Sequence, residues 1–394
     1  MKKARSRTLD SWIDYGILMP VFILIVIGMW ALFIALNSGV YKEVLVAMML
    51  KQCAWIIIGI IALLVAMHLD SHLLWLSAIP AYCLGVVMMF LTLLFYSPKL
   101  LEETGSKNWV SIGSHTLFQP SELMKIAYIL FLAYLIVLHN ARNITRSINT
   151  DLILIGKLIL ATIPVVILLK FQNDFGTLMV FIAILCGMIL LAGVSWKILL
   201  PAILIIFSIV ALFIFLIMHD VGREILQKSG IMKEYQMARI DAWLDPFNDV
   251  NGRSYQQLQG LIAIAIGEIF GRGFDHGYTR IYVPVRESDM IFTVIGENFG
   301  FVGCTLVILL YFLLIYRMIK ITFETNNQFY TYIISGLIMM FLFHVFENIG
   351  SNIGLLPLTG IPLPFISQGG SSMVVNLLGI GLILSMYYHR NLDS

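Results

Sequence analysis

Residues 15–36 read YGILMPVFILIVIGMWALFIAL, a run without a single charged side chain. A helix rises 1.5 Å per residue, so about 20 apolar residues are needed to cross the hydrocarbon core of a bilayer. The run meets that length, lacks a small-residue cleavage pattern and is followed by further apolar runs. It therefore predicts a retained membrane-spanning helix and argues against a cleaved signal peptide.

Similar runs recur along the rest of the chain. By the same criterion, spans are expected near residues 45–67, 73–96, 121–139, 152–169, 175–192, 198–218, 290–316, 329–349 and 370–388. Of the 394 residues, 59% are hydrophobic and only 12% are charged, whereas soluble domains carry about 25% charged residues. The sequence thus predicts an all-α polytopic membrane protein with about ten transmembrane helices.

The distribution of cations predicts the orientation and the domain plan. Positive charge stays on the cytoplasmic side of a membrane, and the N-terminal tail, residues 1–14, carries Lys2, Lys3, Arg5 and Arg7. With an even number of spans, both termini are expected to be cytoplasmic. We expect one membrane domain, residues 1–394, with a large extracellular loop, residues 219–289, between the seventh and eighth spans.

Charge and cysteine usage exclude other classes of protein. The net charge of +2 is not gathered into a basic patch, so no nucleic-acid partner is expected. The four cysteines lie within apolar runs and form neither CxxC nor Cys/His spacings. Neither a disulfide framework nor a zinc site is expected.

Within the large loop, Gly260–Phe270 is apolar but too short to cross a bilayer, and it contains Glu268. We interpret it as a re-entrant or interfacial segment, which is tolerated only where protein or water satisfies its backbone.

Asp289 is the strongest candidate for a catalytic residue. It lies in Pro284-Val-Arg-Glu-Ser-Asp289, at the start of the eighth span. Desolvation at the membrane rim raises the pKa of a carboxyl group toward a value suited to a general base. A helix N-cap is the alternative interpretation, and the neighbouring Arg286 and Glu287 could be solvated loop charges.

Three further groups of polar residues have two interpretations each. Glu122 and Lys125 lie three residues apart at the start of the fourth span. They form either an interfacial ion pair or a charged pair that faces an external cavity. Ser371 and Ser372 follow two glycines at the start of the tenth span. One interpretation is a close-packed turn, and the other is a helix start whose free N–H groups could bind a phosphate. Trp109 is either an interfacial anchor or a contact for a sugar or lipid.

Taken together, these segments resemble the SEDS family (shape, elongation, division and sporulation). The matching segments are Gln119-Pro-Ser-Glu-Leu-Met-Lys125, Gln172-Asn-Asp-Phe-Gly-Thr177, Tyr235-Gln-Met-Ala-Arg239-Ile, Gly252-Arg-Ser-Tyr255-Gln256, Glu287-Ser-Asp289-Met-Ile-Phe, Asn348-Ile-Gly and Pro364-Phe-Ile-Ser-Gln-Gly-Gly-Ser-Ser372. They follow the family's order over nearly the whole chain. Leu358-Thr-Gly-Ile-Pro362 is similar to the branch that acts in cell elongation.

The resemblance implies a peptidoglycan polymerase of the bacterial cell membrane. Its substrate would be lipid II, and its partners a class B penicillin-binding protein and the elongation machinery. Asp289 matches the family's essential acid. The resemblance also implies that the substrate is bound by Trp109, Glu122, Lys125 and Gln256. The chain departs from the family pattern at Asn108, where an arginine is frequent, and at Glu268.

The expected reaction joins the 4-hydroxyl of an acceptor sugar to C1 of a lipid-diphosphate donor, with inversion. Asp289 is predicted to be the base, and cationic help for the leaving diphosphate would come from Lys125, Arg286 or a divalent cation, Mg or Mn. No other cofactor is expected. The alternatives are a lipid II flippase and a non-catalytic scaffold for the penicillin-binding protein.

Overall fold

The computed structural model describes residues 13–37, 43–97, 101, 105–112, 115–228, 234–247, 254–273 and 281–389. Most of the N-terminal tail, with its four cations, lies outside them. The long helices are α1 (Tyr15–Leu36), α2 (Leu45–Ala66), α3 (Ser71–Thr92), α5 (Pro120–Arg142), α6 (Ile148–Gln172), α7 (Phe175–Leu191), α8 (Trp196–Met218), α12 (Ile291–Glu324), α13 (Gln328–Asn352) and α14 (Gly370–His389). Each coincides with a predicted span, so the predicted polytopic helical fold is confirmed.

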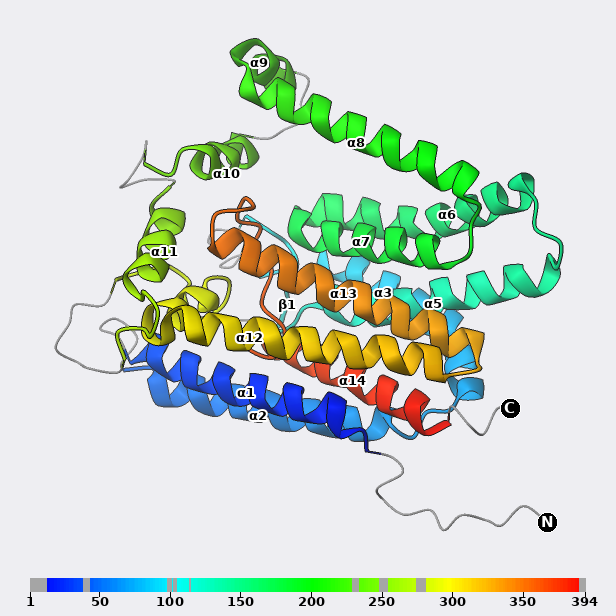
Figure 1. Cartoon of the computed structure of the whole chain (residues 1–394), viewed down its shortest axis with the longest axis horizontal. Coiled ribbons are helices and arrows are strands. Elements are labelled where there is room, and N and C mark those ends of the chain that lie inside the picture. The colour runs from blue at the N-terminus through cyan, green and yellow to red at the C-terminus, as the bar shows by residue number, and fades with distance from the viewer. Residues whose placement is uncertain are drawn as a thin grey trace.

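In the described part of the chain, nine of these helices are long and apolar enough to cross a membrane, and α7, with 17 residues, is shorter. The helices run side by side in one bundle (Figure 1). α1 begins and α14 ends at the same end of the bundle (Figure 1), as an even number of crossings requires.

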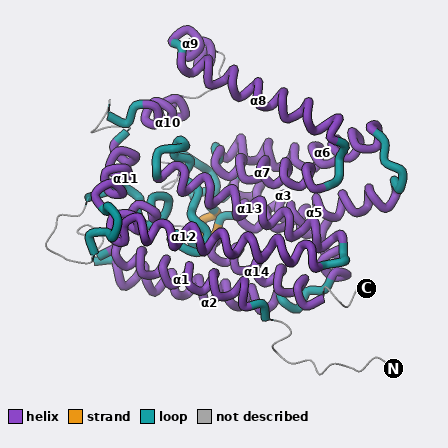
Figure 2. The backbone as a smooth tube through the Cα atoms, viewed as in Figure 1, coloured by secondary structure: helices purple, strands orange, loops and turns teal. Residues whose placement is uncertain are grey.

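The longer irregular segments lie toward the opposite end of the bundle, which we call the loop end (Figure 2). The short elements there are the antiparallel strands β1 (Val110–Ile112) and β2 (His115–Phe118) and the helices α10 (Glu234–Leu244) and α11 (Tyr255–Ile266). A further short helix, α9 (Asp220–Lys228), follows α8.

The core of the bundle is built on α5, α13 and α14, whose apolar windows are 67%, 61% and 72% buried. α2 packs on α14, α3 on α5, α1 on α12 and α7 on α13. Small residues allow close approach of helices in a membrane: Gly336 of α13 contacts Ile129 of α5, and Gly59 of α2 contacts Leu377 of α14. By contrast, only 6% of the apolar window of α8 is buried.

The eighth predicted span is a broken helix. Gly300 of α12 has φ 63° and ψ −158°, a conformation essentially restricted to glycine. The turn after α11 packs against the break, where the N–H of Phe301 donates to the Glu268 carbonyl at 2.9 Å and the N–H of Arg272 donates to the Glu297 carbonyl at 2.9 Å. Backbone groups freed at membrane depth must find such partners.

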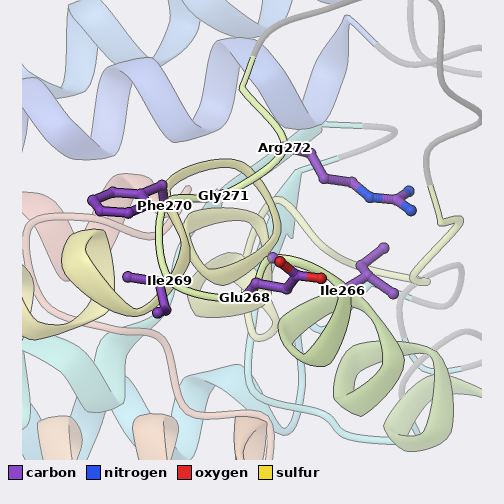
Figure 3. A pocket seen from close by; sticks show the side chains of 7 residues that line it. Ile266, Glu268, Ile269, Phe270, Gly271 and Arg272 are labelled. Carbon is purple, nitrogen blue, oxygen red and sulfur yellow. The ribbon is translucent and has the colours of Figure 1, made fainter.

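The short apolar segment predicted from Gly260 to Phe270 therefore serves as the packing partner of the α12 break. Figure 3 shows the turn, with Ile269 and Phe270 on one side and Arg272 directed away from them. The turn borders a surface hollow of about 490 Å³. Glu268 contributes its backbone carbonyl to the break and has a positive φ of 48°.

Candidate active site

A cavity of about 670 Å³ lies at the loop end of the bundle. Its walls come from residues 105–109, the starts of α5, α7 and α14, the helices α10, α11 and α13, and the segments 285–289 and 358–369. Segments far apart in the sequence therefore meet at one hollow. The predicted site residues that line it are Trp109, Glu122, Lys125, Gln256, Asp289 and Ser372.

Two other predicted residues do not line the cavity. Ser371 is buried, and its Oγ accepts the backbone N–H of Gln119 at 3.0 Å. Arg286 is 2% exposed, and its Nη1 donates to the Ile281 carbonyl at 3.2 Å. Val285 has a positive φ of 53°, which turns the chain so that Val285 lines the cavity and Arg286 enters the protein.

Arg239 of α10 takes the place in the cavity that was expected of Arg286. Its Nη1 lies 3.3 Å from the Leu358 carbonyl oxygen and 3.4 Å from that of Thr359. Both partners are neutral carbonyl groups. No salt bridge joins Arg239 to a carboxylate of any described residue. Sequence reasoning noted Arg239 only as part of a loop motif, because nothing local shows that α10 folds back over the cavity.

Asp289 is held at the rim of the cavity by its own backbone. Its carbonyl oxygen accepts Nδ2 of Asn348 at 2.8 Å and Nδ2 of Asn352 at 2.9 Å, both from α13. Its Oδ1 accepts the Ser288 hydroxyl at 3.0 Å. The cap position of α12 is Met290, so the N-cap interpretation of Asp289 does not apply.

The surroundings of Asp289 favour the protonated carboxyl group. Burial raises its pKa above the ordinary value, the Ser288 hydrogen bond and the charge of Arg239 act against this, and Glu287 adds to it. Gly360, at φ 84°, faces the carboxylate, and a Cβ there would come within 3.3 Å of Oδ2. The absence of a side chain at Gly360 leaves room beside the acid.

A buried polar cluster forms the inner wall of the cavity. Lys125 Nζ donates to Glu122 Oε1 at 2.9 Å and lies 3.0 Å from Nε2 of His344 on α13. Lys125 is 1% exposed and Glu122 4% exposed. Of the two interpretations of this pair, the structure shows the charged pair that faces the cavity. His344 was not predicted as a site residue.

A second polar wall surrounds Asp174, which sequence reasoning also missed. Its carboxylate accepts the N–H of Thr177 at 3.0 Å as the N-cap of α7, and it accepts Nδ2 of Asn108 at 2.8 Å and Nε2 of Gln119 at 3.2 Å. An aspartate just ahead of an apolar run is a signal for a helix cap, which hides any second role. Asn108, the departure from the family pattern, thus has a defined partner.

Glu347 of α13 lies beside the cavity without lining it. Its Oε1 accepts the hydroxyl of Thr359, which does line the cavity. The carboxylate therefore ties α13 to the segment 358–360.

A divalent cation would find few protein ligands. Among the residues that the structure describes, no three His, Cys, Asp or Glu side chains come together. Mg²⁺ can be bound by one or two carboxylates with substrate phosphates, but the residues present do not form a metal site by themselves. We derive no chemical step through a metal.

Comparison with known proteins agrees with this architecture. The family model for the FtsW, RodA and SpoVE cell cycle proteins matches residues 14–392. The chain is 31% identical to the Bacillus subtilis stage V sporulation protein E over 85% of this chain and 86% of that protein. It is 32% identical to the Escherichia coli peptidoglycan glycosyltransferase MrdB over 74% of this chain and 73% of that protein.

Solved structures show the same fold. A chain from a study of structural coordination of polymerization and crosslinking by a peptidoglycan synthase complex superposes with a TM-score of 0.74, at 27% identity over 96% of this chain and 98% of that chain. Thermus thermophilus RodA superposes with a TM-score of 0.66 at 24% identity, over 96% of this chain and 97% of that chain, which supports the fold alone. The family match over residues 14–392 and the likeness of fold agree, and the chain belongs to the FtsW/RodA/SpoVE family of cell cycle proteins.

Proposed function

We propose that this chain is a peptidoglycan glycosyltransferase that polymerises lipid II, with Asp289 as its base. The observation that carries the proposal is the single cavity in which a desolvated acid, a buried lysine and an arginine free of salt bridges to described residues come together. The family and the relatives named as peptidoglycan glycosyltransferases support it.

The proposed reaction uses the cavity residues in distinct roles. Asp289 takes the proton of the acceptor 4-hydroxyl as its oxygen bonds to C1 of the donor sugar. The bond from C1 to the diphosphate oxygen breaks, and the lipid diphosphate leaves with the electron pair, which inverts C1. Proton removal of this kind contributes about 10²–10⁴-fold.

We propose that Arg239 binds the leaving diphosphate together with Lys125. Lys125 has one carboxylate partner, Glu122, and Arg239 contacts only neutral carbonyl oxygens among the described residues. A guanidinium can bind two phosphate oxygens at once. Arg286 is buried away from the cavity, so we assign it no contact with substrate.

The finer assignments rest on the same comparisons. Leu358-Thr-Gly-Ile-Pro362 supports the elongation branch, that of RodA, although proteins named FtsW and SpoVE are about equally similar. The similar chain in a peptidoglycan synthase complex supports a penicillin-binding partner. We propose that the loop end lies outside the cell and both termini in the cytoplasm, because α1 begins and α14 ends at the opposite end of the bundle and the tail ahead of α1 carries four cations.

A flippase and a scaffold are the competing functions. A flippase needs a polar path across the membrane. The charged residues that line the described cavity instead lie at the loop end of the bundle. A non-catalytic scaffold does not require a buried lysine and a desolvated aspartate in the same cavity. The arrangement therefore favours catalysis.

The test is polymerisation of purified lipid II by the full-length chain, followed as glycan strands on a gel. We expect Asp289→Asn, which keeps the shape of the side chain, to lower the rate by about 10²-fold or more. Asp241→Asn is the matched control, because Asp241 is exposed and pairs with Arg223 on α9. Near-normal polymer from Asp289→Asn would refute the assignment of the base.

A further inference from the structure

His344 makes two contacts that together determine its state. Its Nδ1 lies 2.7 Å from the Met340 carbonyl oxygen, and its Nε2 lies 3.0 Å from Lys125 Nζ. A carbonyl oxygen can only accept, so Nδ1 carries the hydrogen. An ammonium group can only donate, so Nε2 presents a lone pair. The imidazole is therefore neutral, in the Nδ1–H form.

This state defines the directions in which Lys125 can donate. An ammonium group has three hydrogens on a flexible stem. Glu122 Oε1 takes one at 2.9 Å and His344 takes a second. Because Lys125 lines the cavity and is otherwise buried, the third hydrogen is left for a group inside the cavity.

The neutrality of His344 is also important for charge. Glu122 already balances the charge of Lys125, and a second carboxylate in the place of His344 would make the cluster anionic. A neutral acceptor orients the ammonium and adds no negative charge. The cluster of Lys125, Glu122 and His344 is thus neutral overall and does not repel an anionic oxygen.

We propose that His344 is a positioning residue that aims the Lys125 ammonium at an anionic oxygen of the lipid-diphosphate substrate. The proposal rests on the proposed function for the identity of the ligand. In this role His344 acts through Lys125 and not through a substrate contact of its own.

Three variants of the full-length chain test this role. His344→Leu removes the acceptor, and His344→Gln offers an amide oxygen in its place. His139→Leu is the matched control, because His139 also contacts a lysine, Lys157 Nζ at 3.3 Å, but from the last turn of α5, away from the cavity. His344→Met, similar in volume, replaces His344→Leu if that variant does not fold.

In polymerisation of lipid II, we expect His344→Leu to lower kcat/KM by about 10-fold or more, because the Lys125 ammonium remains but loses the acceptor that orients it; removal of a donor itself costs about 10²–10³-fold. We expect His344→Gln to stay within about threefold of the unmodified chain, and His139→Leu to leave kcat/KM unchanged. Equal losses in His344→Leu and His344→Gln would overturn the proposal.

A double-mutant cycle separates positioning from packing. If His344 acts through the ammonium, His344→Leu has no further effect on kcat/KM once Lys125→Met is present. If His344 only fills space, its loss is the same in both backgrounds, and the proposal fails.

Binding of undecaprenyl diphosphate, measured without turnover, separates this inference from the proposed function. Weaker binding by His344→Leu supports the positioning role even if the chain makes no polymer. Normal polymerisation with equal binding by the unmodified chain and His344→Leu would overturn the positioning role and leave the proposed function in place.

Discussion

Two charged clusters lie at opposite ends of the bundle, one around Lys125 and one around Arg317. Arg317 of α12 bonds to Asp14 ahead of α1 through Nε at 2.9 Å and to Glu324 through Nη1 at 3.3 Å, and its guanidinium lies 5.7 Å from the centre of the Tyr387 ring. Its partners tie α1, α12 and α14 together. The Lys125 cluster has fewer partners and opens into a cavity.

The difference indicates which charge is functional. A guanidinium whose donors meet carboxylates and whose face meets a ring is satisfied by the protein itself, and it stabilises the packing of helices. An ammonium with one donor left at the wall of a cavity is incomplete without a ligand. Intramembrane charge alone therefore does not identify a functional site. A charged donor with a hydrogen left for a ligand at a cavity wall, as in Lys125, does identify one.

The largest effect is expected at Lys125. Lys125→Met should lower polymerisation of lipid II by about 10²–10³-fold, because it removes a fixed donor at the reacting anion. Thermal unfolding of the purified variant in detergent serves as the control. A rate near that of the unmodified chain would show that the open donor has no catalytic role.

Arg317→Met should have the opposite profile. It leaves Asp14, which is 4% exposed, without its cation, and breaking a buried pair costs about 3–5 kcal/mol. Because Arg317 is partly exposed, we expect a loss of roughly 2–3 kcal/mol in the free energy of unfolding. The rate per folded molecule should stay within about twofold, since the site is at the other end; a selective loss of rate would contradict the comparison.

A smaller effect is expected in the pH dependence of the Arg239→Gln variant. Asp289 must be deprotonated to act as a base, so kcat/KM falls as the pH drops through its pKa. The charge of Arg239 lowers that pKa, and its removal should shift the acidic limb of the profile to higher pH. Arg239→Lys keeps a charge and should restore the limb; an unchanged limb in Arg239→Gln would place Arg239 too far from the acid to matter.

Much of this architecture could be predicted because it depends on local properties. Apolar runs of sufficient length gave the positions of the ten long helices, and Glu122 and Lys125 share a face of α5 through their spacing alone. The break in α12 could not be predicted in this way. Gly300 is one glycine in an apolar run, and its conformation depends on the turn of α11 that packs against it.

The cations of the cavity show the same limit. Arg286 adjoins Asp289 in sequence, yet the left-handed Val285 turns it into the protein. Arg239, fifty residues before Asp289 in the chain, reaches the cavity because α10 folds back against the segment 358–359. In the sequence, His344 is a single histidine within a predicted span. Its contact with Lys125 depends on the packing of α13 beside α5.

By itself, the sequence determined the membrane class, the number of long helices and the candidate base, because hydrophobic length and local motifs act over a few turns of chain. Only the tertiary structure decided which cations reach the cavity and which acceptors orient them. Those contacts join α5, α10 and α13, and their geometry depends on how distant helices pack rather than on any one segment.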